Sequence, residues 1–465
     1  IDIEFETDAI INAVCLAVCD DKNVASWEFR QKPYEHPKYY DPITFHVSWS
    51  SHACILMRRT TFEHVGGYDP KIFMYGEDVE LSYRFRSNGF VLKYVPSAVV
   101  YHYTYEEAHQ IKTLQFTGSI LSNTYIRFRY GSIRDIFGAI TLQIGLLIKG
   151  AGFEGSRRLV FGNLGELIKN TGYFLGSRKS SDQYFPFRKF DYEMIREGAF
   201  YECKKQIATT EALPLVSIIT RTYRGRELLL KDCIVSVLNQ TYPNIEHLIV
   251  EDGGDTMAPL VDRLKESYSK KYNIIYKALP KKGRSYAGNK ALSLAKGKML
   301  MFLDDDDLLM ADHVEVLVAE LMSNDKIKAA YSLAWDVHTK VNKDTQGNIE
   351  SYQEMMHTTL PYFYQEFSRE RLLKENYIPI QSILFMRELF DNLGGFDESM
   401  DQLEDWNLWI KYAVNNEFKF IKKTTSIFRT PFDLNERVKR QKLLDISYDA
   451  AVKNNENLLS RFDDK

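Results

Sequence analysis

Cysteine is scarce in this sequence, and the scarcity excludes several kinds of protein. Five cysteines occur among 465 residues: Cys15, Cys19, Cys54, Cys203 and Cys233. This odd, scattered set excludes a disulfide-rich fold, and the isolated pair Cys15 and Cys19 cannot supply the four ligands of a structural zinc site. The stretch from Ile1 to Asp8 also lacks the basic start and apolar run of a secretory signal. We therefore expect a reducing, cytoplasmic setting.

An excess of charge and a long apolar run are missing as well. The 60 basic and 63 acidic residues leave a formal net charge of -3, which gives no general attraction to nucleic acid. The longest apolar run, Ile136 to Ile148, is interrupted by Thr141 and Gln143 and is shorter than the roughly 20 residues that span a bilayer. With 45% hydrophobic residues, the chain has material for two or three globular domains.

Four consecutive aspartates, Asp304 to Asp307, follow the apolar run from Met299 to Leu303. Like charges at this spacing repel one another, so we expect a hard cation or solvent to compensate them. Open α/β sheets bind ligands beyond the carboxyl ends of their strands, which is where these carboxylates lie. The alternative is a solvated acidic turn ahead of a helix that begins at His313.

One motif occurs twice in the chain. Phe62 to Asp69 and Phe390 to Asp397 share an aromatic start, a Gly-Gly turn and an aromatic-Asp end. The acidic pairs Glu77-Asp78 and Glu404-Asp405 follow in the same order, each opening a predicted helix. Two matches in one order favour an internal duplication over coincidence.

The two copies differ in what precedes them. Before the second copy, predicted strands and helices alternate, which indicates a largely parallel sheet covered on both faces; they are Val216–Thr222, Leu228–Leu238, His247–Val250, Pro259–Tyr268, Ile274–Tyr276, Tyr286–Ala295 and Met299–Leu303. Nothing comparable precedes the first copy. We predict an α/β protein with the back part of a first module at 1–105, a helical connector at 106–211, a complete module at 212–432 and a C-terminal helix at 433–465.

The predicted connector is amphipathic and basic. Apolar residues recur three and four apart in Ile133–Ile148 and Leu159–Ile168. Its basic residues include Arg127, Arg129, Arg134, Lys149, Arg157 and Arg158. One interpretation is a peripheral contact with anionic lipid at the inner face of the plasma membrane. The other is a connector whose basic residues face water.

The stretch from about Leu215 to Pro431 resembles the family 2 glycosyltransferases, which have the A-type glycosyltransferase fold. The motifs that carry the resemblance are Val216–Tyr223, Ser236–Pro243 and Ile249–Gly254, together with the aspartate run. Two positions depart from the family pattern: Arg221 stands where proline is common, and Gly288 where arginine is usual. Residues from about Val47 to His102 are similar to the back halves of rhamnosyltransferase-like members.

The resemblance implies a nucleoside-diphosphate-sugar donor and a divalent metal. Asp304-Asp305-Asp306 corresponds to the family's Asp-x-Asp signature, which implies that Asp306 and Asp304 bind Mg²⁺ or Mn²⁺. Asp252 accepts a hydrogen bond from uracil or thymine, so the donor is UDP- or dTDP-linked. The residues expected at the donor are Thr220, Arg221, Tyr223, Asp252, Gly253, Arg284, Asn289, Asp304, Asp305 and Arg429.

For catalysis, the resemblance implies that Asp405 is the base, with Glu404 beside it, and that one base acts with inversion at the anomeric carbon. Asp78 is a vestigial or first-module base. The expected function is metal-dependent transfer of a sugar to a growing cell-surface polysaccharide, such as O-antigen or capsule, or to a lipid-linked acceptor. The alternatives are a nucleotidyltransferase and a non-catalytic glycan-binding or scaffold module, the latter most realistic for residues 1–105.

Overall fold

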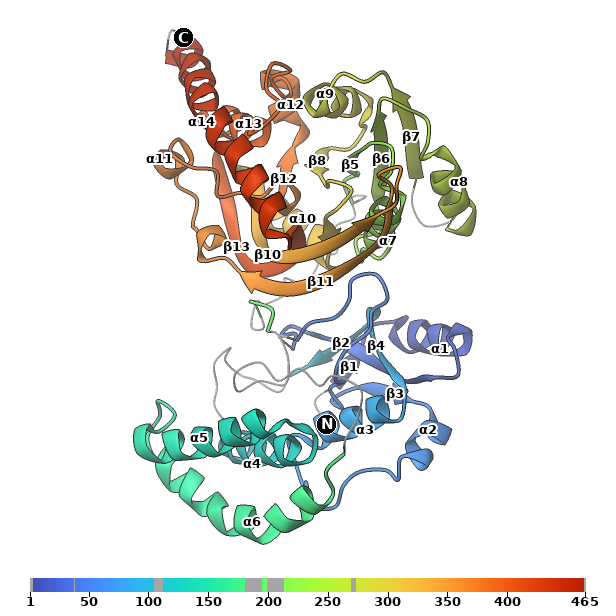
Figure 1. The fold of residues 1–465 in the computed structure, drawn as a ribbon, viewed down its shortest axis with the longest axis vertical. Helices are drawn as coiled ribbons and strands as arrows, with labels where there is room; N and C mark the ends of the chain where they lie inside the picture. Colours follow the sequence, from blue (N-terminus) through green and yellow to red (C-terminus); the bar gives the residue numbers. More distant parts are fainter. Residues whose placement is uncertain are drawn as a thin grey trace. The chain divides into compact units, whose positions relative to one another are not determined.

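The chain forms two compact units, Ile1–Cys203 and Lys204–Lys465 (Figure 1). The computed structural model describes residues 3–36, 38–103, 112–179, 195–198, 213–268 and 273–463. None of the helices in these ranges combines the length and the apolar character needed to cross a membrane.

The first unit is built on a four-stranded sheet in the order β1-β4-β2-β3. Strands β2 and β4 are parallel, whereas β1 pairs with β4, and β3 with β2, in antiparallel fashion. Helix α1 packs on β2 and β4. The elements are β1 (Ile3–Phe5), α1 (Ala9–Cys19), β2 (Val24–Lys32), β3 (Ile55–Met57), α2 (Arg59–His64), α3 (Glu77–Ser87) and β4 (Val91–His102).

The helices of the predicted connector belong to the first unit. Helices α4 (Thr113–Tyr130), α5 (Ile133–Lys149) and α6 (Ser156–Gly176) pack against one another. Arg129 at the end of α4 forms ion pairs with Asp69 and Glu80, so α4 is held to α3 and the preceding loop. Glu80 and Asp69 are buried, and Arg129 supplies the charge that makes their burial tolerable.

The second unit contains a nine-stranded sheet in the order β7-β6-β5-β8-β12-β10-β13-β9, with β11 on β10. Its first four strands are parallel, as predicted, and β12 then runs antiparallel between β8 and β10. The strands are β5 (Val216–Thr222), β6 (Ile245–Asp252), β7 (Asn273–Leu279), β8 (Met299–Phe302), β9 (Leu308–Leu309), β10 (Ile327–Lys343), β11 (Ile349–Thr359), β12 (Ile383–Met386) and β13 (Glu417–Pro431).

Helices cover this sheet, and the predicted C-terminal helix is part of the unit. The Trp406 ring stacks on Tyr448 at 5.6 Å, which holds α14 against α13. The helices are α7 (Glu227–Leu238), α8 (Ala258–Ser267), α9 (Arg284–Leu294), α10 (His313–Ser323), α11 (Arg369–Leu372), α12 (Arg387–Leu393), α13 (Glu404–Tyr412) and α14 (Leu434–Asp463), with 3-10 turns at Pro361–Phe363 and Ile380–Ser382.

The two sheets share one strand order over four strands. In the second unit, β9-β13-β10-β12 has an antiparallel, a parallel and an antiparallel pairing. The first unit repeats these pairings in β1-β4-β2-β3. The structure therefore matches the expected partial second copy in topology as well as in the repeated motif.

Candidate active site

The acidic run lies at the edge where the parallel strands β5 and β8 end. Because these strands are neighbours in register, the last residues of β5 reach the aspartates that follow β8. Arg221 donates from Nε and Nη2 to the two carboxylate oxygens of Asp304, each at 2.9 Å. Thr222 Oγ1 donates to Asp305 at 2.7 Å. A bidentate arginine–carboxylate pair of this kind fixes both side chains.

Arg226 neutralises the middle of the run. Its Nε donates to both oxygens of Asp305 at 2.8 Å, and its Nη2 lies 2.7 Å from Asp306 Oδ2. Burial raises the pKa of Asp305 to about 6 in spite of this charge. For Asp306, burial acts in the same upward direction, but Arg226 outweighs it and lowers the pKa. The expectation that only a cation or solvent compensates the run was incomplete, because it missed Arg226, which follows β5 in the Tyr223–Arg226 turn.

Asp307 is held by the end of β13. Burial and the neighbouring Asp306 charge raise the pKa of Asp307 well above its usual value. The backbone N–H of Arg429 donates to Asp307 Oδ1 at 2.9 Å. The Arg429 guanidinium reaches Glu354 on β11 at 2.9 Å and the Asp306 carbonyl oxygen at 3.4 Å. Arg429, expected to contact the donor, therefore lies at the acidic strand end, where its main charged partner is Glu354.

A divalent cation at the acidic run would take most of its ligands from a substrate, with Asp306 and Asp304 as the protein carboxylates that would hold it. No three acidic, histidine or cysteine side chains converge as a complete cage within the described part of the chain. Asp306 keeps 36% of its side chain exposed and Asp304 27%, whereas Asp305 and Asp307 are buried. Two accessible carboxylates leave coordination positions of Mg²⁺ or Mn²⁺ for diphosphate oxygens and water.

A single arginine joins the acidic strand end to helix α13. Arg221 Nη1 donates to Glu404 Oε1 at 3.0 Å while its other nitrogens hold Asp304. Arg284 Nη1 lies 3.8 Å from the same Glu404 oxygen. Charge from both carboxylates outweighs burial and raises the pKa of Arg221, which stays fully protonated. The two acidic motifs, far apart in the sequence, therefore share one site.

Asp405 is the carboxylate of α13 with the properties of a base. Its Oδ2 accepts a hydrogen bond from Asn376 Nδ2 at 2.9 Å. Burial and the charge of Glu404 raise the pKa of Asp405 to about 6, so the group is mostly ionised at neutral pH yet basic enough to take a proton. The sequence reasoning missed Asn376, which lies in a loop without a repeating pattern.

The loops after β5 and β6 carry the remaining donor-side residues. Asp252 accepts hydrogen bonds from the backbone N–H groups of Lys282 at 2.8 Å and Gly283 at 3.2 Å. Gly253 has a φ of +95°, which favours glycine at this turn. Tyr223 is half exposed, and Arg226 and Lys281 lie 5.1 and 5.7 Å from its ring centre. An aromatic face beside cations suits a base attached to a diphosphate.

Two residues expected to contact the donor, Thr220 and Asn289, instead form hydrogen bonds with other parts of the fold. Thr220 is fully buried, and its hydroxyl lies 2.8 Å from His247 Nε2. Asn289 accepts from the Phe396 N–H at 2.7 Å and donates to the Phe396 carbonyl at 3.0 Å, which pins the turn after the second Gly-Gly motif. The structure does not bring either side chain to the aspartates, because both are bonded within the fold.

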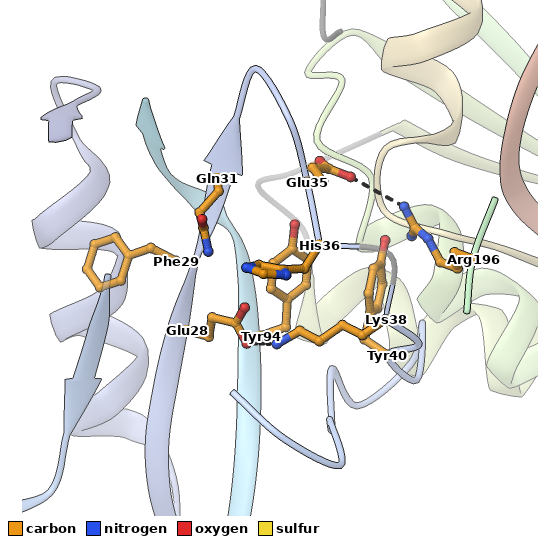
Figure 2. Close-up of a pocket in the computed structure, with 9 residues that line it drawn as sticks. All are labelled: Glu28, Phe29, Gln31, Glu35, His36, Lys38, Tyr40, Tyr94 and Arg196. Carbon is orange, nitrogen blue, oxygen red and sulfur yellow. Dashed lines mark hydrogen bonds and ion pairs between the residues drawn. The ribbon is translucent and has the colours of Figure 1, made fainter. Parts of the chain in front are cut away.

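The first unit has its own hollow, which has a volume of about 310 Å³ including its open mouth (Figure 2). Its lining comprises Glu28, Phe29, Gln31, Glu35, His36, Lys38, Tyr40, Tyr94 and Arg196. Lys38 pairs with Glu28, and Glu35 with Arg196, as Figure 2 shows. Burial lowers the pKa of His36 to about 3, so the ring is neutral.

Asp78, the counterpart of Asp405, has a similar electrostatic setting. Burial and the adjacent Glu77 raise the pKa of Asp78 to about 7. These are the same two leading causes that act on Asp405. The charges of Lys38 and Glu28, two residues that line the hollow, also act on the pKa of Asp78. The first copy thus retains a carboxylate whose pKa is raised by the same causes as that of Asp405.

The mixed sheet, its carboxylate-tipped strand and the aspartate on the facing helix define an A-type glycosyltransferase fold. Residues 217–394 match the family model described as Glycosyl transferase family 2, and residues 44–117 match Glycosyltransferase like family 2. The two matches lie in different units of the chain, and each is to a family 2 glycosyltransferase model.

Individual relatives cover parts of the chain. Chondroitin synthase of Escherichia coli is 30% identical over 228 residues, which are 48% of this chain and 30% of that protein. N-acetylglucosaminyl-diphospho-decaprenol L-rhamnosyltransferase of Mycobacterium tuberculosis is 43% identical over 74 residues, 16% of this chain and 21% of that protein. The crystal structure of S. aureus TarS 1-349 in complex with UDP-GlcNAc is 18% identical, with 46% of this chain and 58% of that chain covered at a TM-score of 0.36. The chain thus spans less than a third of the length of these two curated relatives.

Proposed function

We propose that the second unit transfers a sugar, with inversion, from a nucleoside-diphosphate-sugar to a growing glycan, and that the transfer depends on a divalent metal. The observation that carries this proposal is the Arg221 junction. One guanidinium bonds both Asp304, at the acidic strand end, and Glu404, next to Asp405. A donor diphosphate at the first group and an acceptor hydroxyl at the second would lie within one site.

Each side of the site has a separate role in this proposal. Asp306 and Asp304 would hold Mg²⁺ or Mn²⁺, which would supply positive charge for the departing diphosphate. Tyr223 and Asp252 would receive the base of a UDP- or dTDP-linked donor. Asp405 would remove the proton of the acceptor hydroxyl as it attacks the anomeric carbon. One base without a second nucleophilic carboxylate supports inversion.

The acceptor class is proposed from the relatives. The chondroitin synthase of Escherichia coli supports a growing polysaccharide, and the mycobacterial rhamnosyltransferase supports a lipid-linked acceptor. We propose a cell-surface glycan, such as capsule or O-antigen, assembled on the cytoplasmic side of the plasma membrane. An exposed apolar surface on helices α5 and α6 of the first unit would bring the chain to that membrane.

The test is donor binding and turnover with a panel of UDP- and dTDP-sugars. Nucleoside diphosphate release should require Mg²⁺ or Mn²⁺ and stop with EDTA. Asp306→Ala should remove the metal dependence of donor binding, whereas Asp405→Asn should abolish transfer and leave metal-dependent donor binding intact. Asp325→Asn, the same chemical change at an exposed turn, is the control.

Two results would contradict the proposal. Unchanged turnover after EDTA treatment, together with unchanged donor binding by the Asp306→Ala variant, would refute the metal dependence. A product whose anomeric configuration matches that of the donor by NMR would refute direct displacement with a single base.

A further inference from the structure

Helix α5 exposes a continuous apolar stripe. Ile133, Phe137, Ile140, Ile144 and Ile148 follow one another at spacings of three and four residues, so they lie on one face of the helix. Between 41% and 71% of each residue is exposed. The helix packs through a different face, where Ala139 and Gln143 are buried and Gln143 Nε2 donates to Thr124 Oγ1 at 2.9 Å. The stripe is therefore not needed to hold α5 in the unit.

Helix α6, which packs against α5, carries a second stripe. Phe161, Ile168 and Leu175 recur every seven residues, and 38% to 76% of each is exposed. Its packing face is again separate, since Val160 and Phe174 are fully buried. Single exposed apolar residues are ordinary, but a row of them on each of two contacting helices indicates an interaction surface.

Basic residues accompany the two stripes. Arg134 and Lys149 lie at the two ends of α5, and Arg157 and Arg158 lie in the first turn of α6. All four are exposed, and none forms an ion pair with another residue in the described ranges. On a helical projection Arg157 and Arg158 fall on either side of the line through Phe161.

Two further arginines of the predicted basic surface do not contribute to it. Arg127 and Arg129 are buried. Arg127 Nε donates to Asn123 Oδ1 at 2.8 Å, and Arg129 pairs with Glu80 and Asp69. The sequence-based expectation of six outward basic residues is wrong for these two, because α4 is the helix that docks onto the rest of the unit.

We propose that the exposed faces of α5 and α6 bind an anionic lipid surface. The apolar rows would enter the boundary between headgroups and acyl chains, and Arg157 and Arg158, which flank the row on α6, would contact lipid phosphates. A second copy of this chain is a poorer occupant, because an isologous pairing of this face would bring both copies of these cations into one interface that supplies no anions for them. This inference does not depend on the transfer activity of the second unit.

Vesicle flotation of the full chain tests the proposal. Vesicles with about 30% phosphatidylglycerol should float the protein at low salt, and vesicles of phosphatidylcholine alone should float it far less. Phe137→Glu with Ile144→Glu should weaken binding at least about tenfold, because charges would replace the inserted side chains. The control is Phe73→Glu, at a loop residue that is 86% exposed and outside both helices, and it should bind as the unchanged chain does.

A second pair of variants distinguishes loss of lipid binding from misfolding of the first pair. Arg157→Glu with Arg158→Glu leaves the apolar rows intact and should weaken binding about tenfold or more at low salt, with a smaller effect at high salt. Failure of the unchanged chain to float with anionic vesicles would overturn the proposal. So would binding by both pairs of variants that equals the binding of the unchanged chain, or a dimer in sedimentation that the Phe137→Glu and Ile144→Glu pair dissociates.

Discussion

Replacing Glu404 with Gln should shift the acid limb of the transfer rate to lower pH. Asp405 acts as a base only when ionised, and its pKa is raised to about 6 by burial and by Glu404. The unchanged chain should therefore transfer at about half its maximal rate at pH 6 and about a tenth at pH 5. Glu404→Gln removes a negative neighbour, which lowers the pKa of Asp405 and preserves the ionised base at lower pH.

The size of this shift follows from the contacts of Glu404. At an effective dielectric constant near 20, unit charges about 4 Å apart interact by about 4 kcal/mol and more distant ones by less, so a charge on the adjacent residue can contribute more than one pKa unit. Arg221 already neutralises part of the Glu404 charge at 3.0 Å. We therefore expect a shift of about one pH unit, and burial of Asp405 should keep its pKa above the ordinary carboxyl value.

Asn376→Ala provides the opposite perturbation. The Asn376 amide donates to Asp405 at 2.9 Å and favours the ionised carboxylate. Its removal should raise the pKa of Asp405 and shift the acid limb to higher pH.

The assay is the initial rate of nucleoside diphosphate release between pH 4.5 and 8 at saturating donor and acceptor, with circular dichroism at each pH to exclude unfolding. Opposite displacements of the limb by the two variants would support Asp405 as the titrating base. An acid limb that neither variant moves would refute the reasoning, because the titrating group would then lie elsewhere.

Two further predictions concern stability. Gly288→Ala should destabilise the second unit by about 1–3 kcal/mol in urea unfolding, because the added methyl group would lie 2.6 Å from the Phe396 ring; Gly145→Ala, where no atom lies within 4 Å, should not. Arg129→Met should lower the stability of the first unit by about 3 kcal/mol in thermal unfolding, because it leaves the buried Glu80 without its closest cation. An Arg129→Met variant as stable as the unchanged chain would contradict the assigned role.

The sequence predicted the parts of the second unit that have strong periodic patterns. The strand predicted at Met299–Leu303 became β8, and the parallel order of the front half followed from alternating strands and helices. The β10–β11 hairpin went unpredicted, since β11 is largely polar and partly exposed and gives little hydrophobic signal. This hairpin supplies Glu354, the carboxylate that fixes Arg429.

The charged contacts of the candidate site were harder to predict than its aspartates. A run of four aspartates is visible in any reading of the sequence, but Arg221 and Asp304 are 83 positions apart and meet only because β5 and β8 are neighbours. Arg226 reaches Asp305 from 79 positions away for the same reason. Pairing across a sheet depends on strand order, which local patterns do not specify.

Arg221 and Gly288 illustrate why two departures from a family pattern have to be interpreted together. A buried guanidinium is costly unless carboxylates surround it, and Arg221 has Asp304 and Glu404 within hydrogen-bonding distance. It also needs space: a Cβ on Gly288 would lie 3.6 Å from Arg221 Cδ and 2.6 Å from the Phe396 ring. A larger residue at position 288 would therefore compete with Arg221 for the space beneath Phe396. The glycine on α9 and the arginine on β5 are complementary parts of one arrangement, which places a positive charge between the two acidic motifs.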